Sequence, residues 1–545
     1  MTAAATNRLV DGGAQGGSLT GVWKLVGFMI RSDRVKLPAW TGGIALLALY
    51  LVALLPEAYG GEGELEAIVG MFGGPAGRVF MGPGYGSDSP SFGQIIGNAY
   101  GLYFLLLSAL MSILLVVRHT RGDEQAGRAE LIRANVVGLH APLAAAVIVA
   151  VITNLVASFL VAGIMIGYGY DPGSSLLFGL SIGSIGLAFA GVAVFTAQLS
   201  EHSRAAAGMA GAVLGASFVI RGGGDMARMG GSALSWFSPL GWGSQTAPFV
   251  LDRWWPLAMA IGFAVLFSAL GFAFSARRDV GAGLLAVRSG RPGAHPSLRS
   301  PLLLAWRLQR SAILWWAGAL AVSGLMFGAF SDAMTAAGDI QTLVEVMGGA
   351  EDIILGYLSF MALYMSFIVG IFAVTCIQSL RGEEADGRAA PLLSAPVSRW
   401  SWMGSSLAVS AIGVVVLQAV TGFATGLSAA VVTGRSSFVV DVGLAHLAHT
   451  PAVLVVLTLG ALLYGLFPRA VPITWLVVAY SMFAPIFGAV AEAPDIVFDI
   501  SPFEHIGQVP LESLDLTALI VLLAIAATFA AIGMTGFRRR GIQVT

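Results

Sequence analysis

The chain has 545 residues, of which 57% are hydrophobic and 11% are charged, and its formal net charge at pH 7 is −1. Soluble globular domains carry about 25% charged residues, so this composition excludes a soluble fold and makes lipid part of the protein's solvent. The near-neutral charge gives no attraction to nucleic acid, and no nucleic-acid partner is expected.

Apolar runs long enough to cross about 30 Å of hydrocarbon predict an all-α polytopic membrane protein with about twelve transmembrane helices. Two of the runs, 205–220 and 450–467, are short or interrupted by glycine. The predicted spans, in chain order, are 39–56, 97–117, 141–167, 175–198, 205–220, 256–276, 312–330, 355–379, 404–432, 450–467, 470–490 and 516–537.

The distribution of charge along these spans predicts their orientation. If the N-terminus is cytoplasmic, every Lys and Arg falls inside except Arg78, Arg221, Arg228, Arg253 and Arg435, and most of the acidic residues fall outside. This bias is the positive-inside rule. We therefore expect a multi-pass protein of the cell (inner or plasma) membrane with both termini in the cytoplasm and with membrane lipid as a partner.

An amphipathic stretch precedes each half of the chain, at 18–36 and at 300–313. In the first, apolar residues recur at helical spacing and Lys24, Arg31 and Arg34 add the basic character of a helix that lies in the headgroup plane. Each stretch is either such an interfacial helix or a simple extension of the span that follows it.

The sequence repeats itself at an offset of about 260 residues. RGDEQAGR at 121–128 aligns with RGEEADGR at 381–388, and SPLGW at 238–242 resembles SPFEH at 501–505. Both halves end in arginines, Arg277–Arg278 and Arg538–Arg540. We therefore predict two similar six-helix halves repeated in parallel, a pseudo-dimer with its axis along the membrane normal.

The predicted organisation follows from these boundaries. A basic segment rich in glycine and proline separates the halves and is typical of a flexible connector. The domains are 1–38, a cytoplasmic tail and interfacial helix; 39–276, the first six-span half; 277–311, a cytoplasmic linker with the second interfacial helix; 312–537, the second six-span half; and 538–545, a basic cytoplasmic tail.

The two repeated loops, 121–140 and 381–400, are longer than a turn requires. Each begins with two acidic residues, at the position where the dipole of a short helix favours them, and then offers leucines or isoleucine as an apolar face. This pattern predicts a short cytoplasmic coupling helix that docks another protein, although a solvated loop is the alternative. The residues concerned are Arg121, Asp123, Glu124, Gly127 and Arg128 with Arg381, Glu383, Glu384, Gly387 and Arg388.

The second loop resembles the coupling loop of exporter-type ATP-binding-cassette permeases of the second membrane class. The residues that carry the resemblance are Glu383, Glu384, Gly387, Arg388, Leu392, Leu393, Ala395, Pro396, Val397, Arg399 and Trp400. The first loop is more divergent, with Asn135, Val136, Val137 and His140 where that Pro-Val and Arg would stand. As a fused twelve-span chain, the protein is similar to the membrane subunit of actinobacterial polyketide-antibiotic (tetronasin-type) exporters.

This resemblance implies a partner. In such permeases the loops seat in two copies of a cytoplasmic ATP-binding-cassette ATPase, which bind ATP and Mg²⁺, and the Ser-Pro segments are external, partly re-entrant elements. The sequence supports a separate motor independently, because it contains no G-x-x-x-x-G-K-[ST] motif and its only lysines are Lys24 and Lys36. We expect a non-catalytic permease subunit that binds no cofactor itself.

Two other classes remain as alternatives. A secondary carrier shares the six-plus-six architecture, but such carriers need an ionisable residue at membrane depth, and every charged residue or histidine falls at a predicted end or in a loop. A membrane-embedded enzyme is suggested by His446 and His449, or by His119 near Asp123, but a metal site needs more ligands. We interpret His446 and His449 as interface histidines.

The polar side chains inside the predicted spans are neutral. They are led by Asn98, Asn154, Gln378 and Gln418, which are the candidates for a substrate pathway, although Asn98 and Asn154 favour helix–helix hydrogen bonds. A pathway without fixed charge suits a bulky, lipophilic cargo such as a polyketide, lipid or hydrophobic drug. The expected function is therefore ATP-driven export of hydrophobic compounds.

Overall fold

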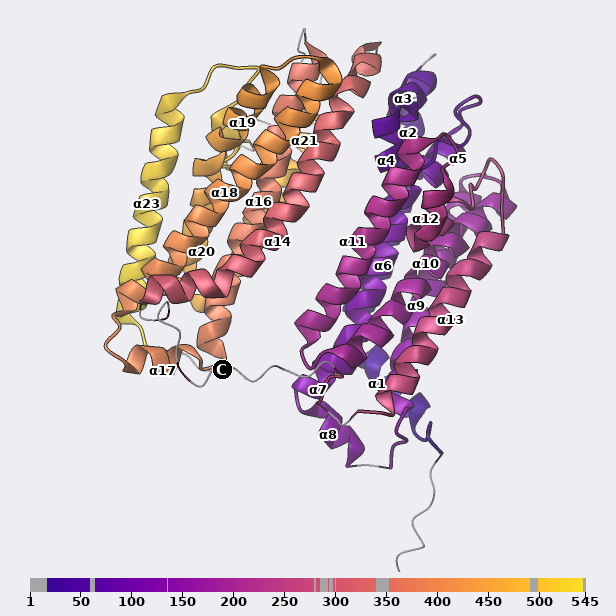
Figure 1. The fold of residues 1–545 in the computed structure, drawn as a ribbon, viewed down its shortest axis with the longest axis horizontal. Coiled ribbons are helices and arrows are strands. Elements are labelled where there is room, and N and C mark those ends of the chain that lie inside the picture. The colour runs from indigo at the N-terminus through magenta and orange to yellow at the C-terminus, as the bar shows by residue number, and fades with distance from the viewer. Residues whose placement is uncertain are drawn as a thin grey trace, which may run out of the picture. The chain divides into compact units, whose positions relative to one another are not determined.

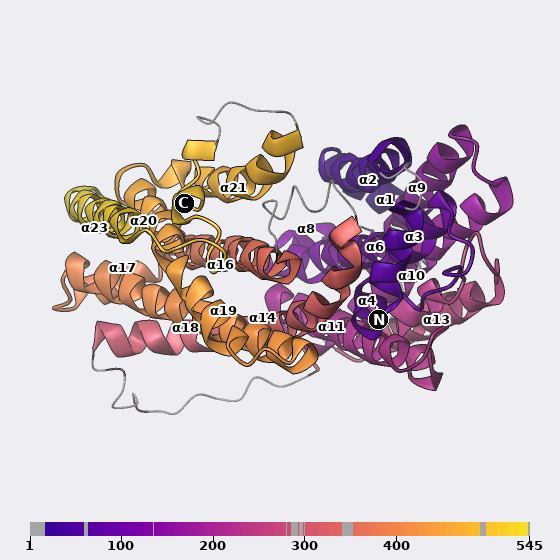
Figure 2. The ribbon, with the colours of Figure 1, turned by 90° about the horizontal axis from the view of Figure 1, so that it is seen from above.

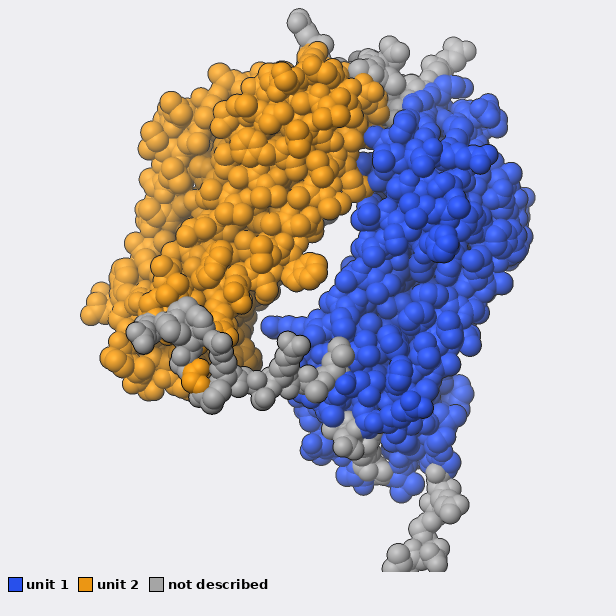
Figure 3. Space-filling model, in the orientation of Figure 1, with its two compact units in different colours: residues 1–289 blue, residues 290–545 orange. Residues whose placement is uncertain are grey.

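In the computed structural model the chain forms two compact units, residues 1–289 and 290–545, which Figure 3 distinguishes by colour. The residues described are 17–58, 64–134, 136–278, 281–284, 293, 298, 300–339, 352–490 and 498–542. Asn135 of the first predicted coupling loop and most of the predicted linker lie outside these ranges. Each unit is a bundle of long helices (Figure 1).

The first unit contains six of the helices that could cross a membrane. Its elements are α1 (Val22–Ser32), α2 (Lys36–Ala58), α3 (Glu64–Gly73), α4 (Pro75–Met81), α5 (Phe92–Gln94), η1 (Ile95–Ala99), α6 (Gly101–Val117), η2 (Arg118–Gly122), α7 (Asp123–Gln125), α8 (Arg128–Arg133), α9 (Ala141–Gly167), α10 (Pro172–Leu199), α11 (Ser203–Ala227), η3 (Ala233–Phe237), α12 (Pro239–Ser244) and α13 (Trp255–Ser275).

The second unit contains five more such helices. Its elements are α14 (Pro301–Ala329), η5 (Phe330–Asp339), α16 (Ile353–Ala385), α17 (Ala389–Ser394), α18 (Arg399–Thr433), α19 (Phe438–Ala448), α20 (Thr450–Leu466), η6 (Pro468–Ala470), α21 (Ile473–Val490), η7 (Glu504–Ile506) and α23 (Leu516–Arg539). The all-α membrane fold is thus confirmed, with eleven candidate spans among the described residues. The predicted span 470–490 falls on α21, which is not one of the eleven, so the count of twelve is not confirmed.

The helix α10 forms the centre of the first unit, where α6, α9 and α13 pack around it. Small residues let the backbones come close: a Cβ on Gly179, Gly183 or Gly186 would overlap with atoms of α9. Close approach through small residues is the usual way in which membrane helices associate. In the second unit α20 packs on α16 and α23, and α20 and α23 approach closely at Gly465 and Gly533.

The two amphipathic stretches fold differently from each other. The first forms the separate helix α1, which buries Leu25, Val26 and Met29 and packs, together with α2, on α9 (Figure 2). The second is not a separate interfacial helix, because α14 runs unbroken from Pro301 to Ala329. Ser300 caps this helix by accepting a hydrogen bond from the backbone N–H of Leu303, and no residue between 301 and 329 interrupts it. The second stretch is therefore continuous with the span that follows it, in one helix.

The helix α11 also extends beyond its prediction and corrects the statement that charged residues lie only at span ends or in loops. The predicted span 205–220 ended before Arg221, whereas α11 continues to Ala227 and buries both Arg221 and Asp225. Their side chains pair at 2.9 Å, one helical turn apart. Opposite charges at this spacing neutralise each other, which allows the helix to continue in an apolar environment. A second partner, Ser235, donates a 2.6 Å hydrogen bond to Asp225.

Both Ser-Pro segments begin short helical turns. Ser238 caps α12 by accepting from the backbone N–H of Gly241, and Ser501 accepts from the backbone N–H of Phe503 at 3.3 Å. The side chains of α12 from Pro239 to Trp242 are buried against α6, α10, α11 and α13. This element is therefore part of the packed bundle of the first unit.

Candidate functional site: the two coupling loops

The two predicted coupling loops share one backbone conformation. A long helix ends after the acidic pair, and a glycine with positive φ follows, Gly127 at 70° and Gly387 at 74°. The N–H of Gly127 donates to the carbonyl oxygen of Glu124 at 3.1 Å, and the N–H of Gly387 donates to that of Glu384 at 3.0 Å. Left-handed glycines commonly terminate helices in this way because they lack a Cβ. Short helices, α8 and α17, then follow.

The acidic residues do not begin α8 and α17, as the sequence had predicted for the short coupling helices, but end the long helices before them. Asp123 and Glu124 extend the second candidate span of the first unit, and Glu383 and Glu384 form the last turn of α16. Acidic side chains are unfavourable near the C-terminus of a helix, where the dipole is negative. Arginines that contact these carboxylates compensate for this position.

In the first unit Glu124 lies between two arginines. Arg121, one turn earlier and fully buried, donates to Glu124 at 2.7 Å. Arg278, just beyond the C-terminus of α13, forms a two-pronged pair with the same carboxylate at 2.7 and 3.1 Å. Arg278 also donates to the side chain of Gln198, at the end of α10, at 2.7 Å. The acidic residue thus ties the loop to the ends of α10 and α13.

In the second unit Glu384 is the counterpart, and its side chain is 3% exposed. Arg540, just beyond α23, donates to both carboxylate oxygens at 2.6 Å. Tyr464, near the end of α20, donates its hydroxyl at 2.6 Å. Burial alone lowers the pKa of Arg540, but the hydrogen bonds and charge of Glu384 outweigh it and raise that pKa, so the arginine stays charged.

We name these two clusters the charge clamps: Glu124–Arg278–Gln198 in the first unit and Glu384–Arg540–Tyr464 in the second. In each, the second acidic residue of the loop pairs with an arginine after the last candidate span. A polar side chain at the end of another long helix completes the cluster: Gln198 accepts from Arg278 in the first unit, and Tyr464 donates to Glu384 in the second. The sequence analysis placed these arginines at the ends of the two halves but did not predict that they contact the loops. The recurrence of a basic residue at the same place in both halves was the signal that could have indicated this contact.

The first acidic residue of each loop makes a local pair. Arg128 donates to Asp123 at 2.9 Å, and Arg388 donates to Glu383 at 2.9 and 3.0 Å. Hydrogen bonds to Glu383 raise the pKa of Arg388. Because Arg388 is half exposed, this pair contributes little to stability, on the order of 0 to 1 kcal/mol. Arg381, in contrast with Arg121, is only half-buried.

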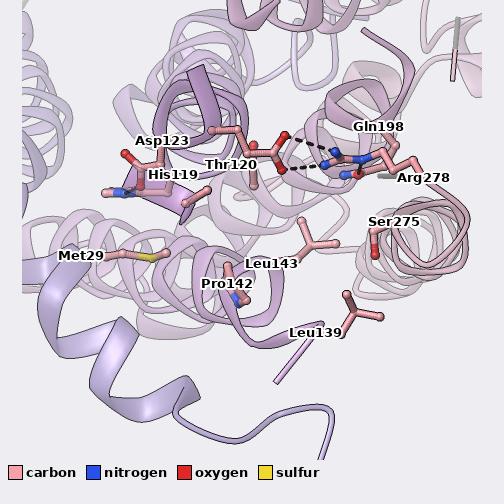
Figure 4. A pocket seen from close by; sticks show the side chains of 12 residues that line it. Met29, His119, Thr120, Asp123, Leu139, Pro142, Leu143, Gln198, Ser275 and Arg278 are labelled. Atoms are coloured by element: carbon pink, nitrogen blue, oxygen red, sulfur yellow. Dashed lines mark hydrogen bonds and ion pairs between the residues drawn. The ribbon is translucent and has the colours of Figure 1, made fainter. Parts of the chain in front are cut away.

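A small cavity of about 60 Å³, lined by both polar and apolar side chains, lies beside the first clamp (Figure 4). His119 and Asp123 lie on one side of it, with Gln198 and Arg278 on the other. His119 is buried between two carboxylates, with Asp33 at 2.7 Å and Asp123 at 3.6 Å. Asp33 belongs to the connection between α1 and α2, so these contacts fasten the amphipathic helix to the loop.

The neutral pathway candidates lie inside the units and make hydrogen bonds there. Asn98 donates to the carbonyl oxygen of Pro248 at 2.9 Å. Asn154 accepts from Ser108 at 2.9 Å and donates to Ser112 at 2.8 Å. Gln418 donates to Ser366 at 3.0 Å, joining α18 to α16. Gln378 is half-buried in α16, one turn before Arg381.

We expect Asn154 to stabilise helix packing. Replacing it with alanine should remove hydrogen bonds to two α6 serines and lower the free energy of unfolding by about 1 to 2 kcal/mol. Thermal unfolding of the purified protein measures this loss, and the spectrum of exported compounds should stay unchanged. A changed spectrum with unchanged stability would instead place Asn154 on the substrate pathway.

The predicted interface histidines are fully buried in the second unit. His446 and His449 lie at the junction of α19 and α20, and their Nδ1 atoms contact the carbonyl oxygens of Val442 and Ala445 at 2.9 and 2.8 Å. Among the described residues no group of three or more His, Cys, Asp or Glu side chains is arranged to hold a metal ion. His446 packs against Gly422 of α18.

Comparison with known proteins decides the family. Residues 298–538 match the family described as multidrug efflux system permease Rv1217c, C-terminal domain. Over 539 residues the chain is 33% identical to the multidrug efflux system permease protein Rv1217c of Mycobacterium tuberculosis (strain ATCC 25618 / H37Rv), covering 97% of this chain and 96% of that protein. The chain belongs to this family of multidrug efflux permeases.

Membership in the multidrug efflux permease family supports the coarser sequence-based expectations. The chain is a multi-pass membrane protein and a homologue of a permease, and the expectation of a transporter is confirmed at this level.

Proposed function

We propose that this permease is the non-catalytic membrane subunit of an ATP-driven exporter of hydrophobic compounds. Two copies of a separate cytoplasmic ATP-binding-cassette ATPase dock on residues 121–140 and 381–400 and bind the ATP and Mg²⁺. The observation that carries the proposal is the pair of charge clamps, which join each loop to the end of a last long helix. A displacement of the loop is thereby passed to α13 or α23.

The outer surfaces of the loops support docking. Leu131 of α8 and Val136 beyond it are 72% and 78% exposed, which is costly for apolar side chains in water. In the second loop Pro391, Pro396 and Trp400 are exposed. Glu124 and Glu384, by contrast, are held inside the clamps, so their proposed role is to position the loop and the partner contacts come from its exposed residues.

The proposed direction and cargo follow from the family and the sequence. The relative is named a multidrug efflux system permease, and the loops lie on the side that the positive-inside rule assigns to the cytoplasm. We infer export of lipophilic, weakly charged compounds, with both termini and both clamps on the cytoplasmic side. ATP-driven closure of the ATPases pulls on the loops, and the fused halves respond by closing the inner side.

One observation bears on the secondary carrier as a second candidate. Arg221 and Asp225 form a buried pair within the candidate span α11, and ionisable groups inside membranes commonly mark proton or ion pathways. These two groups also make structural contacts: Arg221 donates to the carbonyl oxygen of Val79, and Asp225 accepts from Ser235. They therefore tie α11 to α4 and η3. A carrier would transport drug with a proton gradient and without an ATPase.

Docking is tested with charged substitutions on the exposed loop surface. The variant Leu131→Asp with Val136→Asp should weaken binding of a co-expressed ATP-binding-cassette ATPase by about tenfold or more, because it places carboxylates in an apolar contact. Pull-down and drug-stimulated ATPase activity of the purified complex measure the effect. Leu284→Asp, an exposed leucine in the linker, is the matched control and should leave both unchanged.

The proposal fails if wild-type permease captures no such ATPase, or if drug efflux continues in vesicles that hold a proton gradient but no ATP. Equal loss of binding in the Leu284→Asp control would show that the exposed loop surface has no specific role in docking the ATPase. These outcomes separate the ATP-driven exporter from the carrier.

A further inference from the structure

An apolar groove of about 570 Å³ lies in the first unit between α1, the start of α2 and the middle of α9. Leu37 and Pro38 form one wall, and Val149, Ile152 and Val156 form the other. The volume is in the range of pockets that hold a drug-sized ligand. Figure 2 shows the three helices gathered at one side of the unit.

Two arginines lie at this groove, Arg31 in the last turn of α1 and Arg34 in the connection to α2. Arg31 and Arg34 line the groove, and both side chains are exposed. Neither guanidinium group makes a hydrogen bond or an ion pair with another described residue. The nearby acid, Asp33, cannot neutralise them because it is buried in pairs with Arg118 at 2.9 Å and His119 at 2.7 Å. The groove therefore combines an apolar floor with an unopposed positive edge.

This combination matches one kind of molecule. An anionic headgroup gains about 1 kcal/mol for each basic residue near a membrane surface, and the N-terminus of α2, which begins at Lys36, adds a favourable dipole. An acyl chain that covers the apolar walls gains free energy in proportion to the apolar area removed from water. We infer that the groove binds an anionic phospholipid, with the phosphate at Arg31 and Arg34 and one acyl chain along Ile152 and Val156.

The site is separate from the proposed export cycle. The sequence favours a neutral, lipophilic cargo, whereas two unpaired guanidinium groups favour a fixed negative charge. The lipid also bridges α1 to α9, and α1 is in turn joined to the first coupling loop through Asp33 and His119. The inference does not depend on ATP as the energy source.

The headgroup contact is tested by native mass spectrometry of the purified full chain, titrated in detergent with phosphatidylglycerol or with phosphatidylcholine of the same acyl chains. Wild type should prefer phosphatidylglycerol. Arg31→Gln with Arg34→Gln should weaken phosphatidylglycerol binding about 30-fold and leave phosphatidylcholine unchanged. Arg307→Gln with Arg310→Gln is the matched control, because these exposed arginines on α14 have the same spacing.

The acyl-chain contact is tested by filling the groove. Gly27 of α1 lines it, and a Cβ at this position would meet no atom within 4 Å, so the side chain of Gly27→Phe can leave the helix without a clash at its Cβ and occupy the groove. This variant should lose phosphatidylglycerol binding although both arginines remain. Gly163→Phe on α9, where a Cβ is equally free, should bind as wild type does.

Three results would overturn the inference. Equal binding of the two lipids by wild type would show ordinary solvation by the membrane. Equal loss in the Arg307 and Arg310 control would show a general charge effect. Unchanged lipid binding by Gly27→Phe, together with loss of binding of a hydrophobic efflux dye, would assign the groove to cargo.

Discussion

Replacing Arg540 with alanine should lower the free energy of unfolding by about 3 to 5 kcal/mol, because it leaves the carboxylate of Glu384 buried without its positive partner. Glu384 is 3% exposed and accepts hydrogen bonds from both Arg540 and Tyr464. One hydroxyl cannot neutralise the charge, so the last turn of α16 and the end of α23 should separate. Thermal unfolding in detergent, together with drug efflux in cells, measures the loss.

The control for this prediction lies on the same loop. Arg388→Ala removes an arginine from an exposed pair with Glu383 and should cost less than about 1 kcal/mol. The double variant Arg540→Ala with Glu384→Gln should recover much of the lost stability, since no buried charge then remains. If Arg540→Ala and Arg388→Ala behaved alike, the second charge clamp would have no structural importance.

The recovered double variant also separates stability from transport. It should fold but export poorly, because an amide and an alanine no longer fasten the loop to α23. Export at the wild-type rate from this stable variant would contradict the role proposed for the second clamp while leaving its contribution to stability intact.

Replacing Gly465 with alanine should destabilise the protein by about 2 to 3 kcal/mol, although alanine is the better helix former. A Cβ at Gly465 of α20 would overlap with the carbonyl oxygen of Gly533 of α23, and backbone cannot rotate away as a side chain can. The two helices must therefore move apart, which also displaces Arg540 from Glu384. The temperature of thermal unfolding and the rate of drug efflux should decrease together.

The matched control should change the free energy of unfolding in the opposite direction. Gly318 lies within α14, and a Cβ there would meet no atom within 4 Å. Gly318→Ala should therefore stabilise the protein by up to about 1 kcal/mol, the difference in helix propensity. Similar changes in both variants would mean that α20 and α23 do not approach as closely as Gly465 and Gly533 indicate.

Much of the architecture was predictable from patterns in the sequence. Hydropathy identified eleven of the helices that could span a membrane, and the repeated RG-acid-acid and Gly-Arg pattern identified two loops that share a glycine turn. These features are local, so they can be read over a few residues. The predicted span at 470–490 is not confirmed, because α21 is not among the candidate spans found in the described residues.

Contacts between distant residues were less accessible. Nothing within the loops indicated that Glu124 meets Arg278 or that Asp33 meets His119, because these pairs form only when separate helices pack. The buried pair Arg221–Asp225 was missed for a different reason. The spacing of one helical turn between the two residues was visible in the sequence. Each charge was taken separately as marking the end of a span, whereas a paired arginine and aspartate are tolerated inside a span.

The charge clamps also impose an order on assembly. Glu124 and Arg278 are 154 residues apart, and Glu384 and Arg540 are 156 residues apart. During synthesis each acidic residue is made long before its arginine, and the first clamp is complete in sequence before most of the second unit is translated. Domains generally fold in that order as they emerge. Each clamp thus closes only when its own last long helix has docked, which makes it a marker of a correctly assembled unit.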